Sequence, residues 1–366
     1  MSGAANTPER VTRALRELYG SYGYAPFKVR KFEEYDLYAE NKRFLASRQV
    51  LTFHDTDGRL LALKPDVTLS IVKSAANGGG LRKVFYHENV YREPRPGEGF
   101  HEIPQTGLEC IGALDGYAVG EVVMLAARSL QIIGGRCVLD VSHIGLVSGV
   151  LDAAGVDESG RSALFRAVGA KNLPGVRQLC RELGMAAEHA AMLERLVALY
   201  GPLDETLPAA SALPLPARSR AAVRELESLA AQLALYGLDF VNLDFSVVND
   251  VDYYDDIVFR GFVEGAAAGV LSGGRYDRLM ARMGKPGGAI GFAVYLDRLE
   301  RVRETPADYD ADVLVLYSAP EDVPRAVETA EALVRSGETV RVERAAPEGL
   351  RFRRTVRAEN GEVREC

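Results

Sequence analysis

Glu109 is the residue whose position most clearly demands a partner. It stands between Leu108 and Cys110 in the β-rich stretch from Ile103 to Gly112, so a strand there would carry its carboxylate among apolar neighbours. An unpaired charge is costly to bury. The pattern therefore indicates that Glu109 contacts either a ligand or an internal partner.

Asp66 and Thr68 follow a predicted strand end. Two β-rich runs between Val50 and Lys64 flank the turn signal Thr56-Asp57-Gly58, which predicts a hairpin. This hairpin delivers Pro65-Asp66-Val67-Thr68 to the start of the next helix. Residues directly after a strand are well placed to contact a ligand.

Three further groups each admit more than one interpretation. Tyr253-Tyr254 could line a binding site or be alternating strand residues, one in the core and one on the surface. The predicted Gly-rich turn Ser272-Gly273-Gly274 could serve turn geometry or the approach of a ligand, because glycine permits both. Arg275 and Asp277 could pair with each other or cap the following helix.

Metal and disulfide chemistry find no support in the spacing of cysteines and histidines. No two cysteines form a CxxC motif and no two histidines stand at ligand spacing. The sequence predicts neither a disulfide nor a metal site, and no cofactor. These residues are Cys110, Cys137, Cys180, Cys366, His54, His87, His101, His143 and His189.

The periodicity predicts a mixed chain that ends in a small α/β unit. Helices are expected from Thr7 to Gly20 and from Tyr117 to Ile133, with an almost wholly helical stretch from about Gly145 to Gly237. Strands are expected over Lys83–Tyr91, Ile103–Gly112, Cys137–Val141, Phe240–Val248, Ile257–Val263 and Ala289–Ala293. A βαβ unit follows, with strands Asp312–Tyr317 and Thr339–Glu343 around the helix Val323–Ser336.

Composition favours a cytoplasmic, globular protein of two or three domains. The chain has 366 residues, 47% of them hydrophobic, and a formal charge of −7. An acidic balance weakens a nucleic-acid function, since such proteins gather basic surface against phosphate. The arginines at 351, 353, 354 and 357 could instead line a solvated strand face or a partner interface. The N-terminus lacks a signal-peptide pattern and no apolar run approaches 18 residues, so no membrane association is expected.

Six motifs, taken together and in order, resemble the histidyl-tRNA synthetases of class II. They are Lys64-Pro65-Asp66-Val67-Thr68, Tyr91-Arg92, Gln105-Thr106-Gly107-Leu108-Glu109, Asp252-Tyr253-Tyr254, Gly273-Gly274-Arg275-Tyr276-Asp277 and Gly291-Phe292-Ala293 through Arg298. The resemblance implies an α+β fold: an antiparallel sheet with flanking helices over residues 1–305, a helical insertion at about 145–237, and a truncated anticodon-binding-like α/β unit at 310–366. It also implies a dimer built on the N-terminal motif.

The same resemblance assigns a histidine pocket. It implies that Asp66, Thr68 and Gln105 hold the α-amine of L-histidine, while Glu109 and Tyr254 bind the imidazole and Tyr253 lines the pocket. Asp66 stands where the synthetases usually have glutamate, which shortens the reach by one methylene.

The nucleotide side departs from the synthetase pattern. Arg92 and Arg298 match the two general class II arginines, as a vestigial nucleotide site. Asn249 replaces the family's signature arginine, Pro94 a glutamate and Gly99 a second arginine. Loss of one preorganised charge donor costs ~10²- to 10³-fold in rate, so we expect no catalytic residue and no aminoacylation.

The C-terminal unit at 310–366 is truncated relative to the anticodon-binding domain that the synthetase resemblance implies. This truncation also leads us to expect no aminoacylation. The chain resembles the family of ATP phosphoribosyltransferase regulatory subunits, synthetase paralogues that confer histidine feedback on a short-form catalytic subunit. That resemblance implies the short-form catalytic subunit and L-histidine as partners, and no tRNA. The alternatives are an active or partially active histidyl-tRNA synthetase, and a histidine-binding scaffold for an unrelated partner.

Overall fold

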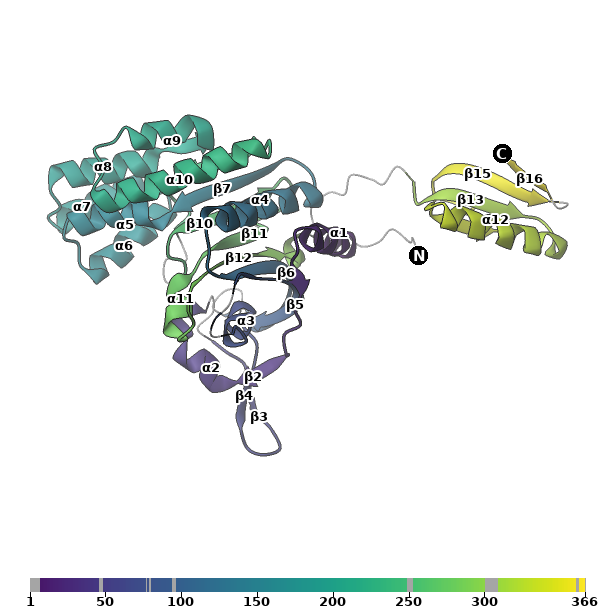
Figure 1. The fold of residues 1–366 in the computed structure, drawn as a ribbon, viewed down its shortest axis with the longest axis horizontal. Coiled ribbons are helices and arrows are strands. Elements are labelled where there is room, and N and C mark those ends of the chain that lie inside the picture. The colour runs from purple at the N-terminus through teal and green to yellow at the C-terminus, as the bar shows by residue number, and fades with distance from the viewer. Residues whose placement is uncertain are drawn as a thin grey trace. The chain divides into compact units, whose positions relative to one another are not determined.

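The computed structural model describes residues 7–45, 49–76, 78, 80–93, 97–248, 253–299, 309–359 and 362–365. These fall into two compact units, one of Pro8–Val302 and one of Arg303–Cys366 together with Met1–Thr7 (Figure 1). Each unit has a hydrophobic core of its own.

A large, mainly antiparallel sheet forms the centre of the first unit. In the described residues its strand order is β1-β5-β6-β12-β11-β10-β7-β9-β8. Neighbours from β5 to β7 run antiparallel, whereas β1 is parallel to β5 and β9 is parallel to β7. The expected α+β class with an antiparallel sheet is confirmed. The strands are β1 (Ala25–Pro26), β5 (Arg82–Arg92), β6 (His101–Gly112), β7 (Cys137–His143), β8 (Tyr200–Pro202), β9 (Val241–Asp244), β10 (Ile257–Val263), β11 (Leu271–Arg275) and β12 (Gly288–Tyr295).

Two helices, α1 (Thr7–Ser21) and α4 (Gly116–Ile133), contribute to the main core over one face of this sheet (Figure 1). Val11, Leu15 and Tyr19 recur on one side of α1 and are fully buried. The Tyr19 ring packs between Phe85 and Phe292, at centroid distances of 6.1 and 5.9 Å. The opposite face of the sheet carries a second hydrophobic core, which includes Val84 of β5, Ile111 of β6 and Ala289 of β12.

Helix α4 is long and apolar enough to cross a membrane, by length and composition alone. In this fold 72% of its 18-residue window is buried. Its one buried acid, Glu121, accepts hydrogen bonds from Lys83 at 2.7 Å and from the Tyr24 hydroxyl at 3.1 Å. These features are those of the core helix of a globular protein.

Helices fill the stretch between β7 and β9 apart from the short strand β8. Side chains of Asp157 and Asn172 cap two of them by accepting the amide protons of Gly160 and Gly175. The last helix packs against the first and against α4. These helices are α5 (Ile144–Ala153), α6 (Glu158–Gly169), α7 (Leu173–Glu182), α8 (Ala187–Ala198), α9 (Leu203–Ser211) and α10 (Ala217–Leu235).

A smaller layer carries the predicted hairpin. Strand β4 pairs antiparallel with both β2 and β3, and the Asp55 carboxylate accepts the amides of Asp57 and Arg59 in the turn. A second core lies here, with Tyr38, Ile71 and Tyr276 among its buried members. The elements are β2 (Phe32–Glu34), α2 (Tyr35–Glu40), η1 (Lys42–Phe44), β3 (Thr52–His54), β4 (Leu60–Leu63), α3 (Thr68–Lys73) and α11 (Asp277–Arg282).

The expected turn at Ser272-Gly273-Gly274 is wrong, because these residues lie inside strand β11. A Cβ on Gly273 would lie 2.4 Å from Cβ of Phe292, and one on Gly274 would lie 2.7 Å from Cδ1 of Tyr254. The glycines therefore serve close packing around a strand. Strand β12 is followed by a short 3-10 helix, η2 (Leu296–Leu299).

The second unit extends the predicted βαβ pattern to a four-stranded sheet ordered β14-β13-β15-β16 in the described residues. Helix α12 packs on one face, where Val313, Val315 and Val356 are buried. Asn360-Gly361, a dipeptide typical of hairpin turns, lies outside the described residues, and the flanking strands pair antiparallel. The elements are β13 (Ala311–Tyr317), η3 (Pro320–Asp322), α12 (Val323–Arg335), β14 (Val340–Glu343), β15 (Phe352–Glu359) and β16 (Glu362–Glu365).

Candidate ligand-binding site

Glu109 lies at the middle of β6 with 2% of its surface exposed. One carboxyl oxygen accepts the Thr68 hydroxyl at 2.7 Å, and the other accepts the Tyr276 hydroxyl at 2.5 Å. Burial raises the pKa of Glu109 to about 8, and nearby Asp66 adds to the rise against the two hydrogen bonds. The group is therefore held near its titration point at neutral pH.

Glycines on the adjacent strands leave the space that this carboxyl occupies. Gly291 on β12 stands opposite Glu109, and Gly274 on β11 stands opposite Gly291. A Cβ on Gly291 would lie 1.7 Å from Oε2 of Glu109. Side chains of alternate residues share a strand face, so Gln105, Gly107 and Glu109 lie on the same face of β6. This face, together with the glycines of β11 and β12, forms the floor of the site. Gln105 is 5% exposed.

Aromatic rings wall the site. Tyr253 and Tyr254 precede β10 and contact each other edge to face at 4.7 Å between centroids. Tyr253 also lies 5.8 Å from Tyr276 and 6.4 Å from Phe44. Burial and the negative charge of Asp66 hold the pKa of Tyr253 well above its usual value, so its hydroxyl stays protonated. The interpretation of the pair as alternating strand residues is wrong.

Asp66 opens helix α3 beside Thr68. Its Oδ1 accepts the amide of Leu69 at 2.9 Å, so one oxygen caps the helix. Burial raises the pKa of Asp66 from its ordinary 3.8, while the Leu69 amide and the charge of Arg92 oppose the rise. The structure thus brings Asp66, Thr68 and Glu109 within one polar cluster.

Arg92 and Arg298 meet at a neighbouring tyrosine. Their guanidinium carbons lie 5.8 and 4.1 Å from the ring centroid of Tyr295, which is opposite Gln105 on β12. Arg298 also donates to the carbonyl of Gly269. Two cations therefore flank the cluster on its Gln105 side.

The three positions that depart from the synthetase pattern are only partly visible. Asn249 and Pro94 lie outside the described residues. Gly99 has φ of 81°, a backbone conformation that an arginine would adopt only under strain.

Tyr276 was not singled out from the sequence as a site residue. It stands inside the motif Gly273–Asp277, but that motif was interpreted as a turn, and its tyrosine was not assigned a role. Arg275 and Asp277 do pair, at 2.8 Å, and Asp277 also accepts the amide of Ala289. The ion pair holds Arg275 and Asp277 in place, and these two residues flank Tyr276 in the chain.

No group of three or more potential metal ligands occurs among the described residues. Within that same part of the chain, Cys110, Cys137 and Cys180 are free thiols. The groups that the cluster itself presents are carboxyl, hydroxyl and guanidinium groups.

Comparisons with known proteins identify the family of this chain. A family model described as histidyl-tRNA synthetase matches residues 3–299. A protein of Geobacillus thermodenitrificans named ATP phosphoribosyltransferase regulatory subunit is 31% identical, over 91% of this chain and 85% of its own. One of that name from Clostridium kluyveri is 29% identical, over 90% and 87%.

Solved structures give the same picture. An ATP phosphoribosyltransferase regulatory subunit/histidyl-tRNA synthetase from Bacillus halodurans superposes with a TM-score of 0.75 at 25% identity, covering 97% of this chain and 94% of that one. A chain of the ATP phosphoribosyl transferase (HisG:HisZ) complex of Thermotoga maritima shares the fold, with a TM-score of 0.62 at 17% identity over 79% and 97%.

Proposed function

Since this chain belongs to the family of ATP phosphoribosyltransferase regulatory subunits, within the histidyl-tRNA synthetase family, we propose that it binds L-histidine and regulates a separate catalytic subunit. The catalytic partner would be a short-form ATP phosphoribosyltransferase, which together with this chain starts histidine biosynthesis. The protein would act in the cytoplasm, as a dimer within a hetero-oligomer.

One observation carries the histidine assignment: Glu109 is buried, near its titration point, and held by Thr68 and Tyr276. An imidazole has one nitrogen that donates and one that accepts. A carboxyl group with a pKa of about 8 can donate its proton or accept one at neutral pH. Asp66 and Gln105 supply oxygens for the amine, and Tyr253 and Tyr254 close the aromatic wall.

Aminoacylation is proposed to be lost. Adenylate formation needs preorganised positive charge at the α-phosphate. Arg298 uses one donor on the Gly269 carbonyl, Gly99 has no side chain, and Asn249 is neutral. The remaining cations lie around Tyr295, where they would screen the carboxylate of bound histidine.

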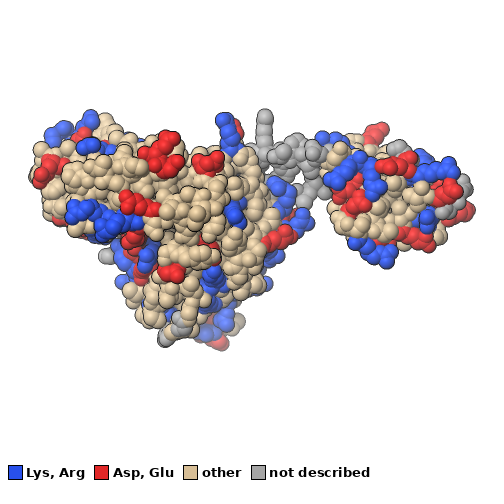
Figure 2. All heavy atoms as spheres, turned by 45° about the horizontal axis from the view of Figure 1, so that its top comes forward, with Lys and Arg blue, Asp and Glu red and all other residues tan. Residues whose placement is uncertain are grey.

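Several arginines of the second unit pair with carboxylates. Arg353 pairs with Asp312 at 3.2 Å, Arg354 with Glu338 at 2.8 Å, and Arg341 with Glu343 at 2.8 Å. Figure 2 shows basic and acidic side chains interspersed on the visible face of this unit. The absence of tRNA binding is therefore part of the proposal.

Titration calorimetry of the purified chain tests this function. Histidine should bind in the absence of ATP, and Glu109→Gln should weaken it because the amide cannot exchange a proton with the imidazole. Histidine-dependent exchange of pyrophosphate into ATP should be absent. Exchange at a rate typical of a synthetase would refute the loss of catalysis, whereas no histidine binding would refute the sensor.

The alternative function, an active or partially active histidyl-tRNA synthetase, is favoured by one observation. Arg92 and Arg298 remain next to the cluster, within 6 Å of one ring. Complementation of a synthetase-deficient strain would establish it. Failure despite soluble expression would count against it.

A further inference from the structure

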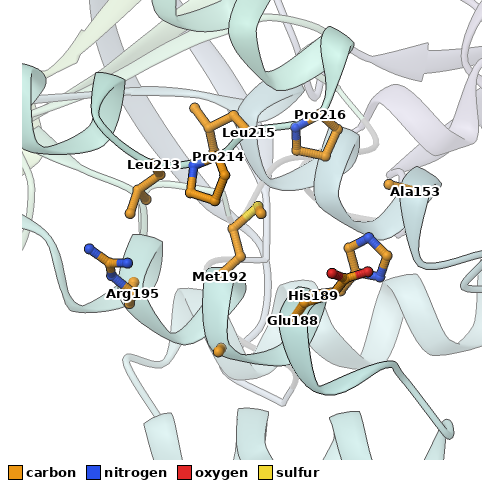
Figure 3. A pocket seen from close by; sticks show the side chains of 10 residues that line it. Ala153, Glu188, His189, Met192, Arg195, Leu213, Pro214, Leu215 and Pro216 are labelled. Atoms are coloured by element: carbon orange, nitrogen blue, oxygen red, sulfur yellow. The ribbon is translucent and has the colours of Figure 1, made fainter.

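A cavity lies in the helical insertion, apart from the Glu109 cluster. A cavity of about 540 Å³ opens between helix α8 and the segment Leu213–Pro216, with Ala153 of α5 at its edge (Figure 3). Pockets that bind ligands commonly measure ~300–1,000 Å³. None of its lining residues belongs to the Glu109 cluster. A ligand in this cavity would therefore bind apart from the proposed histidine site.

The long wall of the cavity is apolar. Met192 on α8 faces Leu213 and Leu215, and all three side chains are less than 9% exposed. Pro214 and Pro216 carry no amide proton, and the amide of Leu215 donates a hydrogen bond to the carbonyl of Leu213. This wall favours an apolar side chain over a polar one.

Opposite charges stand at the two ends of this wall. Glu188, Met192 and Arg195 recur at i, i+4 and i+7, which places them on one face of α8. At 1.5 Å of rise per residue, the two charged residues are about 10 Å apart along the axis. Figure 3 shows Glu188 at the end near Ala153 and Arg195 at the end near Leu213.

These end charges are unpaired, unlike others in the insertion. Across the part of the chain that the structure describes, neither Glu188 nor Arg195 has an ion-pair partner, whereas Arg177 and Glu194 pair at 2.7 Å. His189 beside Glu188 has a buried Nδ1 without a hydrogen-bond partner. Buried polar atoms are as a rule satisfied, so this atom is an exception at the Glu188 end of the cavity.

We propose that this groove docks an extended segment of a partner protein. The segment would carry an apolar residue against Met192, a basic residue at the Glu188 end and an acidic residue at the Arg195 end. In an extended segment, side chains two residues apart share a face at a spacing of ~7 Å. The basic and acidic residues therefore stand four positions apart with the apolar residue midway, and their flexible side chains lean inward to the two ends of the groove. The amine and carboxylate of a single amino acid are too close together to reach both ends.

The test uses the full-length chain labelled with ¹³C at its methionine methyls, with Met192 assigned by Met192→Leu. The probes are the blocked pentapeptides Lys-Ser-Leu-Ser-Glu and Glu-Ser-Leu-Ser-Lys, since the direction of the segment is open, and the neutral Ser-Ser-Leu-Ser-Ser. We expect one charged probe to shift Met192 saturably while Met280, beside Tyr276, stays fixed. The neutral probe should bind more weakly.

Charge reversal supplies the decisive comparison. Arg195→Glu should weaken the preferred probe about threefold to tenfold, as expected for an exposed ion pair turned repulsive. Glu188→Lys with Arg195→Glu should make the protein prefer the other probe. Arg181→Glu, which changes the charge equally on α7 outside the groove, should change nothing.

Three outcomes would overturn the proposal. The first is no Met192 shift with any probe up to its solubility limit. The second is equal affinity for all three probes before and after charge reversal. The third is a Met192 signal that changes with protein concentration alone, which would assign the groove to a second copy of this chain.

Discussion

Glu109 couples the proposed site to pH. Its folded-state pKa of about 8 lies above the ordinary value of 4.5, so between these pH values the folded protein holds a proton that the unfolded chain has lost. The contribution of Glu109 to stability is therefore complete below pH 4.5 and is lost as pH rises through 8. A raised pKa among converging polar groups is typical of functional sites.

The first prediction is that Glu109→Gln flattens this dependence. As pH rises from 5 to 8, the unfolding free energy of the parent should fall relative to the variant by at most ~1.4 kcal/mol per pH unit. Urea unfolding of both proteins at a series of pH values measures the difference. Parallel pH profiles would show that Glu109 titrates normally.

The second prediction concerns Tyr276, whose hydroxyl donates to Glu109 at 2.5 Å. Tyr276→Phe leaves a buried carboxyl oxygen without its donor, and should weaken histidine binding about tenfold. Tyr91→Phe is the matched control, because it removes a tyrosine–glutamate bond of 2.9 Å at an exposed position. Equal calorimetric affinities in the two variants would remove Tyr276 from the site.

Much of the candidate site could be predicted from individual residues. The part that could not be predicted has a physical explanation. The burial of Glu109 follows from its apolar neighbours in a strand, and Asp66 and Thr68 follow from the end of a hairpin. Tyr276 is not predicted as a site residue, because the two glycines before it suggest a turn. In a strand the same glycines make room for Tyr254 and Phe292, and that pairing depends on residues distant in sequence.

At the scale of elements, strands β11 and β12 form the floor on which the site rests. The close approach of Gly291 to Glu109 means that the strand tolerates no side chain there. The helices α1 and α4, periodic in sequence, follow from local pattern. The register that sets Gly291 opposite Glu109 is a long-range pairing that no local pattern fixes.

The third prediction is that Gly291→Ala abolishes histidine binding and costs ~1–3 kcal/mol of stability by overpacking. Gly116→Ala is its control, since nothing lies within 4 Å of a Cβ at that position. Thermal unfolding and calorimetry should separate the two variants clearly. A Gly291→Ala protein that binds histidine normally would contradict the described floor.

At the scale of the whole molecule, every proposed histidine contact lies in the unit Pro8–Val302. The second unit has its own core of Val313, Val315, Ala326, Val356 and Ala358. Sequence periodicity predicted its βαβ start, but the pairing of β15 with β13 was missed because a parallel strand pairing leaves no local signal.

The fourth prediction follows from that division. A chain ending at Val302 should stay folded and bind histidine with unchanged affinity, because no site residue and no part of the main core is removed. Calorimetry and circular dichroism of the shortened chain check this. Loss of binding with retained helicity would show that the second unit contributes to the site.

Feedback at this scale requires histidine to change the free energy of one quaternary state relative to another, with couplings of ~1–3 kcal/mol. By linkage, substrate bound at the catalytic partner would alter histidine affinity here. In the proposed function, the cluster around Glu109, in which Tyr254 packs on Tyr253, would receive the histidine.

The most direct test is histidine inhibition of a short-form ATP phosphoribosyltransferase reconstituted with this chain. The parent chain should activate the catalytic subunit and make it sensitive to histidine. Glu109→Ala and Tyr254→Phe should still assemble and activate while the inhibition curve moves to higher histidine. Inhibition curves identical to that of the parent would contradict the assignment of histidine sensing to this site.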